Sequence, residues 1–292
     1  MAENATIVTT VRLATEYLEY LPDNPFRPTM EYYWTSMTDN YSKFDIASWI
    51  SFIYHEVLYF GICLPAFVCQ FIPAMQKYKI QQDKPESFEN QWKCFKLLMV
   101  NHFLFQAPSI FGIYFFTEMF GIPYDWDSMP PWYDIAWRVF VCAVIEDTGI
   151  TLSIVFSITK ESTNMYTRYI TPFSPGFGFF IGLFLCINHF AFLWAWLLFR
   201  LLETVDVHTG YDLPYNPLHL LPFYAVPKYY GQSQIIPNSY VSSFNRARFH
   251  DFHHMNFHGN YAPTFIWWDK IFGTDRQYEE FKAKHEKLVK TD

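Results

Sequence analysis

Three histidines lie within five positions near the end of the chain, in the stretch "RFHDFHHMNF" (248–257). On a helix, positions i, i+3 and i+4 share one face, so the side chains of His250, His253 and His254 can converge. Neutral imidazole binds borderline metals such as iron, zinc or copper and adds no net charge. The spacing therefore predicts a metal site on a helix, although a polar helix face in water would show the same pattern.

The other candidate ligands give weaker signals. His208, in "VDVHTGYD", follows a long apolar stretch, where a histidine is more often interfacial than a ligand. His102 and His189 lie inside apolar stretches and are expected to be structural. Asp206 and Asp251 are candidates to orient imidazoles, but Asp251 lies one residue off the shared face and is expected to be solvated.

The composition points to a membrane protein. Hydrophobic residues make up 51% of the chain and aromatic residues 22%, whereas charged residues reach only 17%, below the usual quarter. The net charge is −7 and no basic patch stands out, so we expect no nucleic-acid partner. The lipid bilayer is the predicted environment.

Three long uncharged stretches predict membrane spans: residues 57–76, 97–117 and 169–199, of 20, 21 and 31 residues. About 20 apolar residues are needed to cross the hydrocarbon core. The third stretch is too long for one crossing and holds prolines, glycines and Asn188-His189, so we expect a bent or re-entrant pair of helices. A fourth candidate, 132–158, is interrupted by Arg138, Glu146 and Asp147.

These elements predict an all-α integral membrane protein with about four transmembrane helices and a cytosolic, helical, histidine-rich cap. Residues 1–45 form an aromatic-rich lead-in, 46–212 the membrane domain, and 213–292 the cap. The lysine-rich loop between the first two spans is predicted to be cytosolic. The side of the membrane on which the N-terminus lies stays open.

The chain resembles the methylsterol monooxygenases, the sterol C4-methyl oxidases of the membrane-bound fatty acid hydroxylase superfamily. The residues that carry the resemblance are "ENQWKCFK" (89–96), "GIPYDWDSMPPWY" (121–133), "CAVIEDT" (142–148), "RLLETVDVHTGYD" (200–212), "HDFHHMNFHGNYA" (250–262) and "WWDKIFGTD" (267–275). The last two are shared in outline across the superfamily, and the others are specific to the sterol oxidases.

The resemblance implies a multi-pass enzyme of the endoplasmic reticulum membrane that holds two irons. It would oxidise a C4 methyl group of a 4-methyl or 4,4-dimethyl sterol with O₂. Electrons would come from NAD(P)H through a cytochrome b5-type carrier, and other sterol-synthesis enzymes are possible partners. The family pattern assigns metal ligation to His208, His250, His253 and His254.

Two segments depart from the family pattern. Family members place an HxxxH and a second HxxHH cluster soon after "EDT", whereas residues 149–176 here carry none, and 86 residues separate His102 from His189 without a histidine. Residues 226–247 look inserted before the histidine segment. Two irons need several nitrogen ligands each, so the four assigned histidines suffice for at most one.

Three explanations compete for this departure. The favoured one is a splice or gene-model difference, with an exon lost after Thr148 and intron translated before Arg248. The others are a non-catalytic pseudoenzyme or membrane scaffold that binds sterol or sterol-synthesis partners, and an active one-metal variant. The leading expectation is a C4-methylsterol oxidase by ancestry whose activity is impaired in this chain.

Overall fold

The computed structural model describes residues 24–81, 87–159, 181–211, 246–256 and 258–289. Within these ranges the chain is helical and forms no β-strand; a single antiparallel bridge joins Lys79 to Tyr211. The predicted all-α class is therefore confirmed at this level. The inserted-loop prediction for 226–247 and most of the departing segment 149–176 lie outside the described residues.

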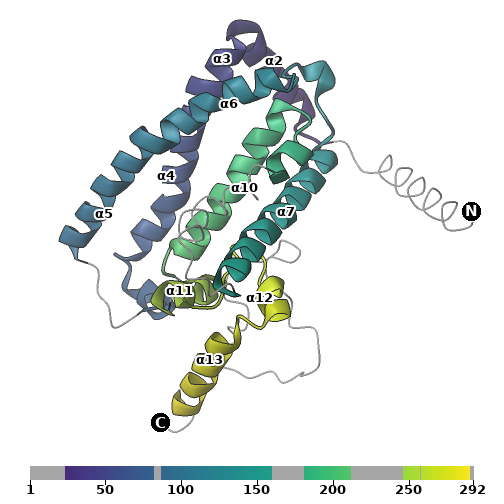
Figure 1. The fold of residues 1–292 in the computed structure, drawn as a ribbon. Helices are drawn as coiled ribbons and strands as arrows, with labels where there is room; N and C mark the ends of the chain where they lie inside the picture. Colours follow the sequence, from purple (N-terminus) through teal and green to yellow (C-terminus); the bar gives the residue numbers. More distant parts are fainter. Residues whose placement is uncertain (1–23, 82–86, 160–180, 212–245, 257, 290–292) are drawn as a thin grey trace, which may run out of the picture.

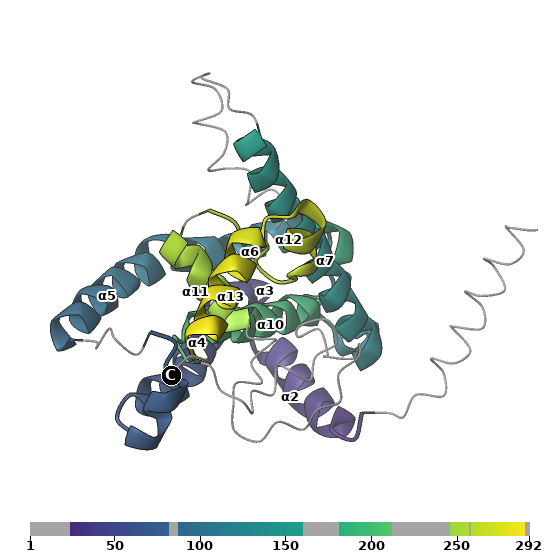
Figure 2. The ribbon, with the colours of Figure 1, turned by 90° about the horizontal axis from the view of Figure 1, so that it is seen from below.

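The helices that matter for the site fall into two groups. In the bundle are α2 (Arg27–Asn40), α3 (Lys43–Asp45), η1 (Ile46–Ile50), α4 (Ser51–Cys69), η2 (Pro73–Tyr78), α5 (Phe88–Asn101), η3 (His102–Gln106), α6 (Ala107–Met119), η4 (Trp126–Ser128), α7 (Trp132–Thr159) and α10 (Phe190–His208). In the cap are α11 (Arg246–Asn256), α12 (Trp267–Phe272) and α13 (Arg276–Val289). Figure 1 shows the cap helices at one end of the bundle, and Figure 2, turned by 90°, shows them lying over that end.

Two continuous helices among the described residues are long and apolar enough to cross a membrane, Lys43–Cys69 and Phe88–Met119. The first begins earlier than the predicted stretch 57–76 and ends before it, because Pro73 starts a separate 3₁₀ turn. This helix also includes Glu56, whereas the predicted stretch began after Glu56 because it was defined as a run without charged residues. About four transmembrane helices, the number expected from the sequence, remains a prediction.

The predicted break inside the third apolar stretch is present in its described part. Residues 181–186 are helical, residues 187–189 are not, and α10 begins at Phe190. His189 caps α10: its Nδ1 accepts the N–H of Ala191 at 3.0 Å, and its Nε2 lies 3.0 Å from the Asp125 carbonyl. Both ring nitrogens are thus satisfied, which confirms the structural role expected for this histidine.

Helix α10 is the central element because it contacts α4, α7 and α11. Its buried side chains include Phe190, Phe192, Leu193 and Trp196, which join the main apolar core. Trp194 reaches α4, where its Nε1 donates to Ser51 Oγ at 2.8 Å and its indole stacks on Tyr54. This helix carries His208 at its last position and so connects the bundle to the cap.

The cap is held together by aromatic packing and one tight turn. Phe252 of α11 contacts Tyr278 and Phe281 of α13, with ring centroids 5.5 and 5.2 Å apart. Gly259 has φ +84°, and a Cβ built there would lie 2.4 Å from the Thr274 carbonyl oxygen. Only glycine fits this turn, which directs the chain from α11 back toward α7.

Candidate metal site

Three imidazole nitrogens meet where the last turn of α10 faces α11. His208 Nε2 lies 3.2 Å from His250 Nε2 and 3.2 Å from His254 Nε2. The third edge, between His250 Nε2 and His254 Nε2, is 3.1 Å. The three atoms form a nearly equilateral triangle, and we call these residues the histidine triad.

The triangle has the size that one metal ion requires. Two nitrogens bound to one metal at about 2.1 Å lie about 3.0 Å apart for a right angle and about 3.4 Å apart for a tetrahedral angle. The observed edges of 3.1–3.2 Å fall between these values. Three ligands on one side of an ion leave its other positions open to further ligands.

A local hydrogen bond of His208 determines which of its two ring nitrogens carries the proton and which can bind a metal. His208 Nδ1 lies 2.7 Å from the backbone carbonyl of Thr204, one turn earlier on α10. This nitrogen must carry the proton, because a carbonyl oxygen only accepts, so Nε2 is left with a free lone pair. Burial lowers the pKa of His254, and the nearby His208 and His253 lower it further. This triad member is therefore biased toward the neutral, metal-binding form.

His253 shares the helix with the triad but does not point into it. Its Nδ1 lies 2.8 Å from the Gly259 carbonyl oxygen. Positions i and i+4 of α11 face His208, whereas His253 is turned about 100° from His254 around the helix. The expectation that all three clustered histidines converge is thus correct for two of them. The bond to Gly259 leaves His253 Nε2 as a free acceptor.

Contacts outside the triad hold α11 against the end of α10. The N–H of Ile80 donates to the Gly210 carbonyl at 2.9 Å, next to the Lys79–Tyr211 bridge. Gln81 Nε2 donates to both carboxylate oxygens of Asp251, at 2.9 and 3.0 Å. Asp251 was expected to be solvated; it is instead a structural acceptor that ties α11 to the segment after α4.

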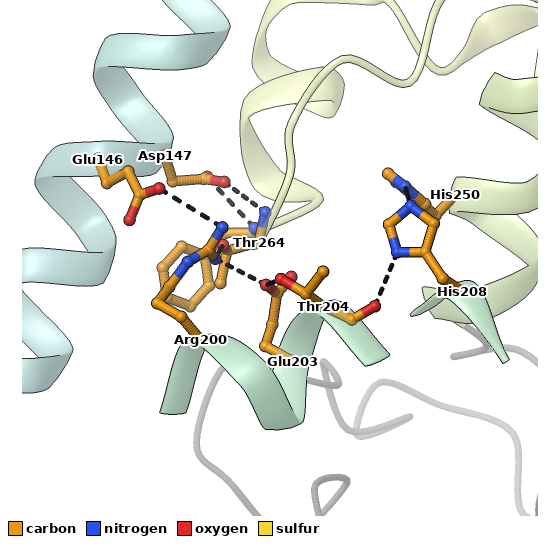
Figure 3. Close-up of polar contacts among 9 residues, drawn as sticks. Glu146, Asp147, Arg200, Glu203, Thr204, His208, His250 and Thr264 are labelled. Atoms are coloured by element: carbon orange, nitrogen blue, oxygen red, sulfur yellow. Dashed lines mark hydrogen bonds and ion pairs between the residues drawn. The ribbon is translucent and has the colours of Figure 1, made fainter. Parts of the chain in front are cut away.

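A buried charged network fixes the turn that follows α11 to the bundle (Figure 3). Both carboxylate oxygens of Asp147, on α7, accept backbone N–H groups of the cap, from Thr264 and Phe265. Arg200, on α10, donates to Glu203 at 2.6 Å and to Thr264 Oγ1 at 3.3 Å. Asp147 has no exposed surface. Of the charges that interrupt the fourth apolar stretch, Glu146 therefore joins α7 to α10 and Asp147 joins α7 to the cap.

A second group with ligand-type atoms lies among the predicted spans. His102 Nδ1 is 2.8 and 2.9 Å from the two oxygens of Glu56, and His55 Nδ1 is 3.0 Å from Oε1. Both imidazoles are buried. Hydrogen bonds of this kind join neighbouring helices in a membrane. The contacts link α4 to η3 and agree with the structural role expected for His102, although its partner Glu56 was not predicted.

Comparisons with known proteins indicate the family of this chain. A family model described as "Fatty acid hydroxylase" matches residues 156–274, which include the whole triad. "Methylsterol monooxygenase 1" of Gallus gallus is 48% identical over 98% of this chain and 96% of its own length. The protein of that name in Danio rerio is 47% identical over 99% and 98%. No solved structure matches.

In residues 156–274, which hold the histidine triad, the chain is similar to the fatty acid hydroxylases. More narrowly, the chain belongs to the methylsterol monooxygenase family, a family of oxidoreductases. A more distant relative is the "C-4 methylsterol oxidase erg25" of Schizosaccharomyces pombe, 27% identical over 80% of this chain. The resemblance found in the sequence motifs is confirmed.

The similarity also contains gaps. The alignment with the Gallus gallus protein spans 303 positions, more than the 292 residues of this chain. The relative therefore has residues with no counterpart here.

The triad predicts a defined metal stoichiometry. Detergent-purified chain, loaded with Fe²⁺ without oxygen and freed of excess metal, should retain about one iron by elemental analysis. Replacing His208, His250 or His254 with alanine should reduce the iron to background, because two imidazoles no longer hold it. His258→Ala, an exposed histidine of the same segment, is the matched control and should retain the metal. Equal loss in all four variants would contradict the assignment.

The Asp147 contacts predict a coupling between the bundle and the cap. Asp147→Asn keeps one acceptor oxygen and leaves one of two buried N–H groups unpaired, at a cost of about 1–3 kcal/mol in folding free energy. Thermal unfolding in detergent should show a lower midpoint. Thr148→Val is the control, since among the described residues the Thr148 hydroxyl bonds to Val144 of its own helix and to nothing else. An Asp147→Asn midpoint equal to the control's would argue against the anchor.

Proposed function

We propose that this chain derives from an iron-dependent oxidase that uses O₂ to oxidise a C4 methyl group of a 4-methyl or 4,4-dimethyl sterol. The observation that carries the proposal is the triad of converging Nε2 atoms in a chain 48% identical to a methylsterol monooxygenase. We place it in the endoplasmic reticulum membrane as a multi-pass protein. Electrons would come from NAD(P)H through a cytochrome b5-type carrier protein.

The residues of the triad fit iron. Iron, when bound, would supply the activation of O₂ and the oxidation of an unactivated C–H bond. His208, His250 and His254 would hold it as neutral ligands, and the hydrogen bond from His208 to Thr204 keeps its ring oriented. His208 and His254 are exposed and His250 is partly exposed, so an electron carrier on the aqueous side can approach.

The apolar helices give a sterol its route to the triad. The two candidate spans are only 11% buried within their most apolar windows, so most of that surface faces outward. Outward apolar surface of this length is covered by lipid. We propose that a sterol dissolved in the bilayer approaches the end of α10 along this surface.

The number of irons expected for this chain is lower than the two that the family pattern implies. Where the family clusters are expected, α7 continues through residues 149–159 with the sequence "GITLSIVFSIT", which holds no histidine or carboxylate. We propose that the chain binds at most one iron and that its oxidation of methylsterols is impaired. His253, with its Nε2 free, would serve a second iron only if the missing ligands were present.

A chimera tests this proposal. Residues 149–176 are replaced with the aligned segment of the Gallus gallus relative, and residues 226–247 are deleted. The iron content should rise from about one to about two per chain. In a cell lysate that supplies NADPH and electron carriers, the chimera should oxidise a 4,4-dimethyl sterol, and mass spectrometry measures the product. Adding His253→Ala to the chimera should return the count to about one.

The parent chain is the control for the chimera and should give no oxidised sterol. Efficient oxidation by the parent would contradict impairment. A chimera that binds two irons yet oxidises no sterol would contradict the proposed reaction.

A further inference from the structure

The segment that follows η2 touches both of the elements that carry the histidine triad. The N–H of Ile80 donates to the Gly210 carbonyl at 2.9 Å, just beyond His208 at the end of α10. The next residue, Gln81, donates through its Nε2 to both carboxylate oxygens of Asp251 on α11, at 2.9 and 3.0 Å. Consecutive residues of the connection between α4 and α5 thus join the end of α10 to α11.

Asp251 is placed to transmit this contact to the ligands. It directly follows His250, and His254 lies on the next turn of α11. Successive residues of a helix are turned by about 100° around its axis, so Asp251 can hold Gln81 without entering the triad. The contact with Gln81 therefore restrains the rotation of α11 about its own axis, while the backbone bond of Ile80 restrains the end of α10.

The triad is sensitive to that rotation. The outer atoms of a side chain lie about 5–6 Å from the helix axis, so a rotation of α11 by about 10° moves them by about 1 Å. The Nε2 atoms of His250 and His254 both lie 3.2 Å from His208 Nε2. A displacement of that size breaks the match to one ion, because metal–nitrogen distances vary little from about 2.1 Å.

The contact between Gln81 and Asp251 is a weak contributor to stability. Both side chains are partly exposed, so water competes for the same donor and acceptors. Asp147, by contrast, is fully buried and secures the cap to α7 through two backbone N–H groups. The cap therefore keeps its anchor on α7 when Gln81 is replaced, and what changes is the orientation of α11.

We propose that Gln81 is a positioning residue: through Asp251 it holds α11 at the rotation that the histidine triad requires. The inference rests on the proposed function, because it takes the triad as a metal site. It deepens that function by assigning part of the control over metal geometry to the connection between the two candidate membrane spans.

Cobalt binding tests the proposal without enzymatic turnover. Full-length chain in detergent is titrated with Co²⁺ alone, whose d–d absorption reports the affinity and the ligand geometry; imidazole suits this metal as it suits iron. Gln81→Leu removes the donor and should weaken Co²⁺ binding about tenfold, as is typical of groups that orient metal ligands. The d–d bands should change as well, whereas the unfolding midpoint of the metal-free chain should stay close to that of the parent.

Two further variants at the same position give the effect a sign. Gln81→Lys restores a donor to Asp251 and should return the affinity to within about threefold of the parent. Gln81→Glu places two carboxylates face to face and should weaken Co²⁺ binding more than leucine does. Both variants keep a polar side chain, so they cover the case in which Gln81→Leu fails to fold.

A matched control and a second substitution locate the effect. Gln91 is also a partly exposed glutamine, and its Nε2 donates to Gln70 Oε1, joining α5 to the end of α4. Gln91→Leu should bind Co²⁺ as the parent does. In an Asp251→Ala background, Gln81→Leu should have no further effect, because its partner is already gone.

The outcomes separate the two claims. The positioning role is overturned by an unchanged affinity in Gln81→Leu, by no recovery in Gln81→Lys, or by an equal loss with and without Asp251. A lower unfolding midpoint with unchanged Co²⁺ affinity shows a structural role only and also overturns it. Each of these results leaves the proposed function standing. A parent chain that binds no Co²⁺ contradicts the metal site, and both claims fail with it.

Discussion

The geometry of the metal site depends on a buried carboxylate that is not itself a ligand. Asp147 accepts two backbone N–H groups of the cap, and this fixes the segment that follows α11 to α7. Because α7 and α10 are packed together, the cap can adopt only a narrow range of positions relative to His208. A shift of about 1 Å would separate nitrogens that must lie about 3 Å apart to share a metal.

The charges of α7 and α10 show how an apolar bundle tolerates ionised groups. Burying an isolated carboxylate is unfavourable, so Asp147 uses backbone donors and Glu203 uses Arg200. The Glu56 carboxylate is likewise paired, here with the imidazoles of His55 and His102. Glu146 is the exception, since one of its oxygens lacks a donor among the residues that the structure describes.

The sequence predicted the helical class and the ligand helix, because helix periodicity placed His250 and His254 on one face. It could not place His208 from spacing alone: the convergence depends on how α10 meets α11, and only the family resemblance assigned it. It also could not exclude His253 from the triad, because His253 bonds to Gly259, in a turn six residues later. The first predicted span began after Glu56 because counting charged residues does not show that a hydrogen bond with His102 offsets the free-energy cost of placing the Glu56 carboxylate in the bundle.

X-ray absorption at the iron edge of the Fe²⁺-loaded parent chain identifies the ligand atoms around the metal. We expect three nitrogen neighbours at about 2.1 Å with the multiple scattering of imidazole rings, at about one iron per chain. A shell of oxygen neighbours without that scattering would contradict the claim that His208, His250 and His254 together hold a metal.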